Sequence, residues 1–430
     1  MNYNGEEIVV VSAVRTPFGK FGGLMKDIDI YDLGSIAMKE SMTKIGLSPT
    51  VIDEVWWGCG DTTNCKDPYT PVVARQSLMK AGLPVSTPSI TIDKACVSGM
   101  SAAYYAMSRI KSGEVKVVLT GGATSFSTVP YLARNLRWQG HKVGGIKLED
   151  PLFPLGYKDF APVAVDSGNV ASKFKVSREE QDEFAYNSHL KYGKAYASDF
   201  YKDEMIPLDI LVKKGRNTET FCLDIDEQYR PKVTLADLAK LETIYGNPTV
   251  TAGNAPGLND GAAAQILMTK STADELGLEP LYMIRGMCSV AANADLLPVA
   301  PALAIKKCLN KLNMSIDELD IIEINEAFAC VPLVSCKLLA CSSFIEEDEE
   351  ETLRKIDNYP LDSFSEIRYK QLLAKLNVNG GAIAVGHANT ASGARIMMTA
   401  ATELRRRGGG VAACAICGGL TQGDACIIQV

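Results

Sequence analysis

Residues 89–112 read SITIDKACVSGMSAAYYAMSRIKS, and this stretch determines how the rest of the chain is interpreted. A short β-branched run predicts a strand, a turn of small residues follows, and an apolar pattern then predicts a helix. Cys96 lies at this junction, where the helix macrodipole and free backbone N–H groups favour a thiolate, so it is a candidate nucleophile. A packed structural cysteine is the alternative. Gly99 would let the start of the helix lie close to a neighbouring backbone.

Length and composition place the chain among soluble globular proteins. With 430 residues, 47% of them hydrophobic and 22% charged, it can bury a large core in two or three domains. A net charge of -7 argues against nucleic-acid binding and against an anionic membrane as partner. There is no transmembrane run or signal-peptide pattern, so we expect a cytoplasmic protein whose cysteines are mostly reduced. The single CxxC, Cys414 to Cys417, lacks a second CxxC to complete a zinc site.

Two pairs of segments suggest that the chain is a duplication. Residues 38–58, MKESMTKIGLSPTVIDEVWWG, match residues 305–325, IKKCLNKLNMSIDELDIIEIN, without a gap. Ser98-Gly99 matches Ser392-Gly393, and each pair precedes an Ala/Met-rich helix, a short apolar strand and a Gly-Gly pair. Strands that alternate with helices predict two α/β halves whose corresponding loops meet across a pseudo-twofold axis.

These matches divide the chain. The N-terminal half comprises residues 1–125 and 249–280, and the C-terminal half residues 281–430. Residues 126–248 have no counterpart and predict an inserted loop domain that covers the site. A second insertion, residues 341–370, holds an acidic run that we interpret as a solvated loop, with a partner-binding or lid role as the alternative.

Superposed halves would bring four reactive side chains together. The turn that carries Cys96 would face residues 386–392, which hold His387, and the turn that holds Cys417 would lie nearby. Asn325 ends a predicted buried strand, where an amide is costly unless it is satisfied or used. The structural alternatives are that His387 is a packed histidine and that Asn325 caps the end of its strand. Two cysteines, one histidine and one asparagine suit acyl transfer with carbon–carbon bond cleavage or formation, and glycine-flanked N–H groups would stabilise the oxyanions.

The chain resembles the thiolase family, whose members cleave 3-ketoacyl-CoA with CoA or run the reverse condensation. The motifs that carry the resemblance, in chain order, are AVRTPFGKFGG, DKACVSGM, GNAPGLNDGAA, NEAF, GGAIAVGH with ASGAR, and AICGGLTQGDA. It implies an α/β fold of two βαβαβαββ halves in five layers with an inserted loop domain. It also implies acyl-CoA and CoA as substrates without a metal or redox cofactor, and a homodimer or homotetramer. Some relatives need a small OB-fold, zinc-binding companion subunit.

The resemblance assigns roles to the four reactive side chains and one glycine. Cys96 would be the acylated nucleophile, His387 the base that activates it, and Cys417 the second acid/base. Asn325 would hold the water of one oxyanion hole. The backbone N–H groups of Cys96 and Gly419 would form the other hole.

The resemblance is weaker around the ligand. Arg230 matches the family's CoA-contacting arginine, Leu238 lies in the segment that borders the nucleotide, and Pro256 replaces a serine that contacts the ligand. Residues 386–393 read GHANTASG where the family has GHPLGASG, and residues 162–166 replace the Met-Gly element of short-chain enzymes. Four aromatic residues nearby would either line a pocket for a bulky acyl group or form the core of the insertion. They are Trp138, Phe153, Tyr157 and Phe160.

The resulting hypothesis is a thiolase that prefers a bulky or aromatic 3-oxoacyl-CoA, such as benzoylsuccinyl-CoA. The first alternative is an acetyl-CoA C-acetyltransferase, an acetoacetyl-CoA thiolase. An alternative of another class is an inactive lipid- or partner-binding relative. A ketosynthase is disfavoured, because those enzymes lack the second catalytic cysteine and Cys417 is present.

Overall fold

The computed structural model describes the chain except for residues 1–5, 61–70, 154–155, 158 and 216. The main elements of the first half of the fold lie before and after a long insertion. They are β1 (Ile8–Arg15), β2 (Gly19–Lys20), α1 (Ile30–Thr43), β3 (Glu54–Gly58), α2 (Val73–Lys80), β4 (Ser89–Ile92), a 3₁₀ turn (Ala95–Val97), α3 (Ser98–Lys111) and β5 (Val117–Thr124), then β8 (Asn259–Thr269) and α8 (Lys270–Glu275). The strands follow the order β1-β8-β5-β3-β4, and the short β2 pairs with β8.

The second half repeats this plan. Its elements are β9 (Tyr282–Ala291), α9 (Ala300–Leu312), β10 (Ile321–Ile324), α10 (Cys330–Leu339), α15 (Ser392–Arg407), β11 (Val411–Gly418) and β12 (Gln422–Gln429). The order β9-β12-β11-β10 matches β1-β8-β5-β3 with the same strand directions. A single parallel bridge between Ile322 and Leu376 takes the position of β4. The repetition confirms the predicted duplication, and β1 pairs with β9 to join the two half-sheets.

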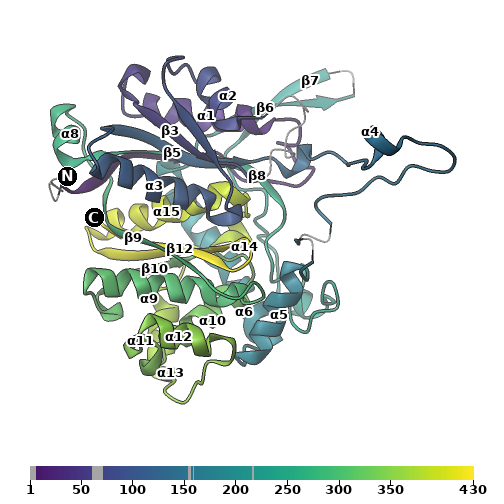
Figure 1. Ribbon diagram of the computed structural model, residues 1–430, viewed down its shortest axis with the longest axis vertical. Coiled ribbons are helices and arrows are strands. Elements are labelled where there is room, and N and C mark those ends of the chain that lie inside the picture. The colour runs from purple at the N-terminus through teal and green to yellow at the C-terminus, as the bar shows by residue number, and fades with distance from the viewer. Residues whose placement is uncertain (1–5, 61–70, 154–155, 158, 216) are drawn as a thin grey trace.

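Five layers result (Figure 1). Helices α1 and α2 cover the outer face of the first half-sheet, and α9 and α10 cover that of the second. Helices α3 and α15 lie between the half-sheets. Strands covered on both faces are buried along their length, as in β1, whose eight residues are all buried and, apart from Ser12 and Arg15, apolar.

The two central helices begin in close contact. A Cβ atom on Gly99 would lie 2.3 Å from the carbonyl oxygen of Thr390, and one on Gly393 would lie 2.6 Å from the backbone nitrogen of Met100. Neither position tolerates a side chain without a backbone shift. The prediction that Gly99 permits a close backbone approach is confirmed, and the contact brings the turns before α3 and α15 together.

Residues 126–248 add helices and one hairpin to the first half. They form α4 (Leu136–Gln139), α5 (Val163–Lys173), α6 (Arg178–Ala197), the hairpin β6 (Leu208–Lys214) and β7 (Asn217–Leu223), and α7 (Leu235–Ala239). Helix α4 lies in an arm that extends away from the body (Figure 1). The domain limits at residues 125, 248 and 280 stay predictions. Within the described residues, none of the helices is long and apolar enough to cross a membrane.

One prediction of local structure is wrong. The acidic run is not a loop: it lies in α11 (Ser342–Glu346) and α12 (Glu349–Lys355), because Asp348 caps α12 and Lys307 pairs with Glu349 at 2.7 Å. The residues before His387 form α14 (Ala382–Val385). Helix α13 (Glu366–Lys375) leads to Leu376, whose bridge to Ile322 takes the position of β4.

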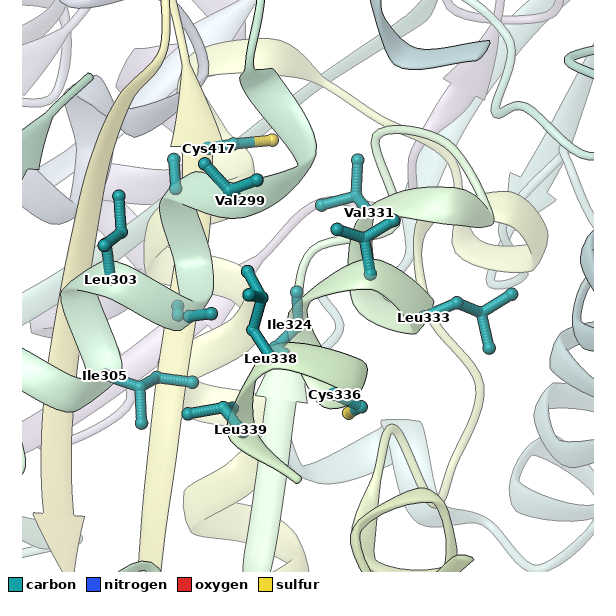
Figure 2. Close-up of a cluster of buried hydrophobic side chains, with 14 of the residues drawn as sticks. Val299, Leu303, Ile305, Ile324, Val331, Leu333, Cys336, Leu338, Leu339 and Cys417 are labelled. Atoms are coloured by element: carbon teal, nitrogen blue, oxygen red, sulfur yellow. The ribbon is translucent and has the colours of Figure 1, made fainter. Parts of the chain in front are cut away.

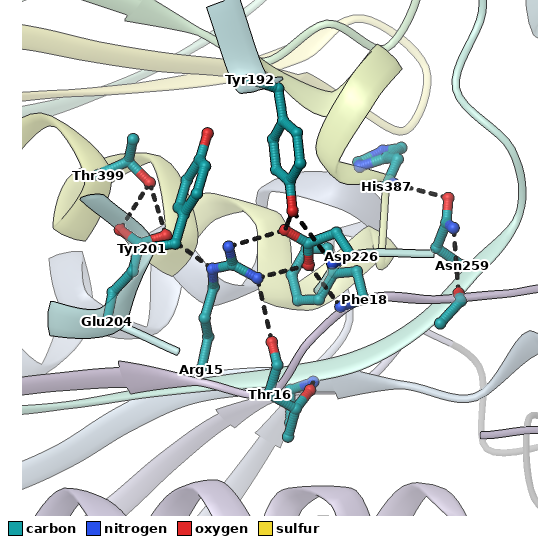
Figure 3. A network of polar contacts seen from close by, with 12 residues as sticks. Arg15, Thr16, Phe18, Tyr192, Tyr201, Glu204, Asp226, Asn259, His387 and Thr399 are labelled. Carbon is teal, nitrogen blue, oxygen red and sulfur yellow. Dashed lines mark hydrogen bonds and ion pairs between the residues drawn. The ribbon is translucent and has the colours of Figure 1, made fainter. Parts of the chain in front are cut away.

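A buried ion network ties β1 to the insertion (Figure 3). The fully buried guanidinium of Arg15 lies 2.7 Å from Glu204 Oε1 through Nε and 2.7 Å from Asp226 Oδ1 through Nη1. Asp226 also accepts a hydrogen bond from the Tyr192 hydroxyl at 3.0 Å. The network therefore satisfies two carboxylates that burial would otherwise destabilise.

We expect Arg15→Met to destabilise the protein strongly. The substitution leaves Glu204 and Asp226 buried without their cation, which costs about 3–5 kcal/mol for a broken buried pair. Urea unfolding of the variant measures the loss. Lys270→Ala is the control, because its exposed pair with Asp274 should contribute little. Equal losses in the two variants would contradict the assignment.

Candidate active site

The turn that carries Cys96 is fixed from both halves of the protein. Ala95 has a left-handed φ of 50°, which shapes the 3₁₀ turn before α3. The ammonium of Lys94 donates to Asp424 Oδ1 at 2.6 Å and to Ser289 Oγ at 2.6 Å. Asp424 is on β12 and Ser289 is on β9, so the second half-sheet holds a turn that belongs to the first half.

Cys96 and His387 are in contact. His387 Nε2 lies 3.1 Å from Cys96 Sγ, and His387 Nδ1 lies 2.7 Å from Ser392 Oγ. The His387 backbone N–H donates to Asn259 Oδ1 at 2.9 Å (Figure 3). With its proton on Nδ1, the imidazole donates to Ser392 and leaves Nε2 free to accept the thiol proton.

Both partners are neutral at rest. Burial raises the pKa of the Cys96 thiol to about 12. Burial, and then the nearby Arg395, lower the pKa of His387 to about 3. The prediction that the start of the helix favours a thiolate is therefore wrong for the resting site, because desolvation outweighs the macrodipole. A thiol held against a neutral imidazole is ready for proton transfer when Cys96 attacks.

One cavity collects five of the eight predicted site residues. Its volume is about 340 Å³, and Cys96, His387, Cys417, Gly419 and Pro256 line it. Cys417 lies at the edge of the core of the second half (Figure 2). Burial raises the pKa of its thiol well above the ordinary value, so Cys417 is a protonated thiol at rest. Two thiols and an imidazole therefore line one cavity.

Asn325 lies behind this cavity rather than on its wall. Its side chain is fully buried, and its Oδ1 accepts a hydrogen bond from Arg395 Nη2 at 3.3 Å. Its Nδ2 has no acceptor among the described residues. Arg395 Nη1 also lies 3.9 Å from Glu323 Oε2, and burial raises the pKa of Glu323 to about 8. Because Arg395 fixes Oδ1, the amide presents donor hydrogens that a water molecule can accept.

The two predicted CoA contacts are not on the cavity. Arg230 is exposed, and its backbone N–H donates to His189 Nδ1 at 3.3 Å. Leu238 is buried against Ala185, Ala329 and Ile383. The structure thus leaves the Arg230 guanidinium accessible and buries the Leu238 side chain in a small separate core.

The aromatic lining differs from the one expected. Tyr157 does line the cavity, but Trp138, Phe153 and Phe160 are 89%, 68% and 49% exposed and line neither the cavity nor a core. The hypothesis that all four aromatics surround the acyl group is therefore wrong. The other aromatic residues of the lining are Phe126, Tyr245 and Phe328. Phe328 is the last residue of the NEAF motif, and this motif is the sequence signal that could have identified it as a site residue.

Sequence reasoning missed the residues that position the reactive groups. Ser392 and Asn259 hold His387, and Asp424 holds Lys94. Each lies inside one of the glycine-rich motifs, ASGAR, GNAPGLNDG or GGLTQGDA. A short polar residue beside glycines was the signal, but its partner is distant in sequence and only the fold reveals it.

Comparisons with known proteins agree with this geometry. Residues 8–271 match the family model "Thiolase, N-terminal domain" and residues 278–430 match "Thiolase, C-terminal domain". The β-ketoadipyl-CoA thiolase of Pseudomonas knackmussii is 36% identical, over 98% of this chain and 99% of the relative. The crystal structure of human mitochondrial 3-ketoacyl-CoA thiolase in complex with CoA has a TM-score of 0.83 at 35% identity, over 99% of this chain and 98% of that one. The acetyl-CoA acetyltransferase of Bacillus anthracis has a TM-score of 0.84 at 30% identity, over the full length of both chains.

The fold and these relatives define an acyltransferase that works on CoA thioesters. The chain belongs to the thiolase family. The five-layered α/β fold predicted from the motifs is confirmed.

Proposed function

We propose that this protein cleaves a 3-oxoacyl-CoA with CoA through an acyl-Cys96 intermediate. The observation that carries the proposal is the 3.1 Å contact between Cys96 Sγ and His387 Nε2 in a cavity that also holds Cys417. His387 takes the thiol proton as Cys96 attacks the 3-oxo carbon. The bond between C2 and C3 then breaks, and Cys417 protonates C2 of the departing acyl-CoA. In the second half-reaction CoA attacks the thioester, and Cys417 accepts the proton of its thiol.

Both attacks create an oxyanion that needs donors in place beforehand. We propose that the backbone N–H groups of Cys96 and Gly419 serve one oxyanion, and that His387 and a water held by Asn325 serve the other. The free Nδ2 of Asn325 supports the second assignment. Removal of one such donor costs about 3 kcal/mol of transition-state stabilisation in well-studied enzymes.

For the acyl group we propose a bulky or aromatic, uncharged substituent. Phe126, Tyr245 and Phe328 line the cavity, and no charged side chain is among the described lining residues. An acyl carboxylate would find no cation there. In benzoylsuccinyl-CoA the uncharged benzoyl group would become the thioester on Cys96, whereas the free carboxylate of the succinyl part would need a cation from outside the described lining. An acetyl-CoA C-acetyltransferase, the name of several relatives, is the second candidate.

Steady-state assays distinguish the two candidates. We expect kcat/KM for an aryl 3-oxoacyl-CoA to exceed that for acetoacetyl-CoA. Phe328→Ala should lower the aryl value by about tenfold or more, since a buried aromatic contact is lost. Trp138→Ala is the control, because its ring is exposed and away from the cavity. Faster turnover of acetoacetyl-CoA by the unmodified protein would reject the aromatic substrate.

The acylation rate should not fall toward acidic pH around pH 6.5. A base must be neutral to accept a proton, and a pKa lowered to about 3 keeps His387 neutral far below the ordinary histidine range. Stopped-flow acylation rates between pH 5 and 8 would therefore be independent of His387 protonation. A rate that halves near pH 6.5 would contradict the proposed state of this base.

We also propose that CoA binds with its phosphates near the accessible Arg230 guanidinium. In this proposal the buried Leu238 side chain anchors the segment that borders the nucleotide. Pro256, on the cavity wall, offers the ligand an apolar contact without a donor. A cytoplasmic location, a homodimer or homotetramer, and a small OB-fold companion subunit stay predictions. Co-purification followed by mass spectrometry would identify such a companion directly.

A further inference from the structure

A second cavity reaches a pair of cysteines. It has a volume of about 550 Å³ and shares no described lining residue with the cavity around Cys96. Cys288 of β9 lines it, whereas Cys308 of α9 is fully buried and is absent from the described lining. The two cysteines belong to one buried cluster, in which α9 packs against β9, and each thiol shifts the pKa of the other. Cys288 can thus be reached through the cavity, whereas Cys308 is buried in the same cluster and can react only with a neighbouring group.

The surroundings of Cys288 carry more positive than negative charge. Lys306, Lys307 and Lys311 line the same cavity, and Glu349, which pairs with Lys307 at 2.7 Å, is the one acidic residue among the described lining residues. The neighbouring Cys308 thiol lowers the pKa of Cys288, with a further contribution from the charges of Lys311 and Lys307. Cys288 in turn, and then burial, raise the pKa of Cys308. Of the two thiols, Cys288 is therefore the one that loses its proton more readily.

We propose that Cys288 is a peroxide-reactive thiol whose oxidation ends in a disulfide with Cys308. The Cys288 thiolate attacks one oxygen of hydrogen peroxide, the O–O bond breaks, and hydroxide leaves, which gives a sulfenic acid. The Cys308 sulfur then attacks the Cys288 sulfur. The S–O bond breaks, and the departing hydroxide leaves as water with the Cys308 proton. Two thiols lose two electrons in total, and one peroxide is reduced to two waters.

Several other described cysteines differ from Cys288 in access or in the direction of the pKa shift. Cys330, Cys336, Cys414 and Cys426 are fully buried, and burial raises the pKa of each. Cys96 is reachable, but its pKa is raised as well. Peroxide should therefore find Cys288 before the buried cysteines of the core.

Peptide mapping tests the proposal. The full chain carrying Cys96→Ser is reduced, treated with hydrogen peroxide at pH 7, alkylated, and digested without reductant. We expect a peptide linked between residues 288 and 308. When Cys308→Ser is added to the Cys96→Ser chain, the linked peptide should disappear. The amount of sulfenic acid that dimedone traps at Cys288 should then rise by about tenfold or more, because the resolving thiol is gone.

Two further variants complete the test. Cys288→Ser should leave Cys308 reduced, and the matched control Cys336→Ser should leave the linked peptide at its full yield. No linked peptide under conditions that oxidise the exposed Cys222, or sulfenic acid at Cys308 in the Cys288→Ser variant, would overturn the proposal. The readout is peptide mass in a chain without Cys96, so the result is independent of whether the proposed thiolase reaction is correct.

Discussion

Cys96→Ser should abolish acyl-enzyme formation while it leaves the fold intact. A serine hydroxyl is a much weaker acid and nucleophile than a thiol, and a neutral His387 cannot compensate for the difference. We expect the acylation rate to fall by at least about a thousandfold. The free energy of unfolding should change by about 1 kcal/mol or less, since the exchange of sulfur for oxygen is small. Intact-protein mass spectrometry after mixing with acyl-CoA measures the acyl adduct.

Cys414→Ser is the matched control for this experiment. Cys414 is a buried cysteine on β11, three residues from Cys417 in sequence, and it does not line the cavity. We expect it to acylate as the unmodified protein does. An acyl adduct on the Cys96→Ser variant with the mass expected for one acyl group would show that another residue is the nucleophile. No adduct on the unmodified protein would favour the inactive lipid- or partner-binding alternative.

Cys417→Ala should separate acylation from carbon–carbon bond cleavage. A simple acyl-CoA can still transfer its acyl group to Cys96, because the CoA thiolate is a stable leaving group. Cleavage of a 3-oxoacyl-CoA releases a carbanion at C2, which needs the proton that Cys417 supplies. We therefore expect acylation by the simple acyl-CoA within about threefold of the normal rate, and thiolysis reduced by about a hundred- to ten-thousandfold.

The comparison of two acyl donors makes the Cys417 result specific. A variant that had merely lost its fold would lose both reactions, whereas loss of an acid/base affects the carbon–carbon step. Circular dichroism and thermal unfolding of Cys417→Ala provide the structural control, with an expected loss of about 1–2 kcal/mol for the small cavity left in the core. Full overall turnover by this variant would remove Cys417 from the proposed mechanism.

Much of the fold was predictable because local signals agree with one another. The strand, turn and helix of residues 89–112 were all predicted, and the structure places them as β4, a 3₁₀ turn and α3. The duplicated segments predicted equivalent helices and strands, α1 with α9 and β3 with β10. The acidic run was misinterpreted for two reasons: the local cap that Asp348 provides to Glu351 was missed, and the lysine partner on α9 is a tertiary feature.

The candidate site was predicted in its residues but not in its chemistry. Cys96, His387 and Cys417 were expected to meet, and they line one cavity. The protonation state of Cys96 was predicted wrongly, because a pKa depends on how much water the fold removes from around the group. The three exposed aromatics were misplaced for a related reason: aromatic composition indicates a capacity for burial, and only packing shows whether the ring is buried.

The amino-acid sequence by itself determined the order of strands and helices, the repetition of the half-fold, and the glycines that let α3 and α15 touch. These features follow from side-chain periodicity and backbone freedom, which are local properties of the chain. Only the tertiary structure determined that the thiol of Cys96 and the imidazole of His387 are in contact within one cavity, and that Cys288 lines a second cavity. Distances between residues far apart in sequence, and the solvent left around them, are properties of the packed molecule.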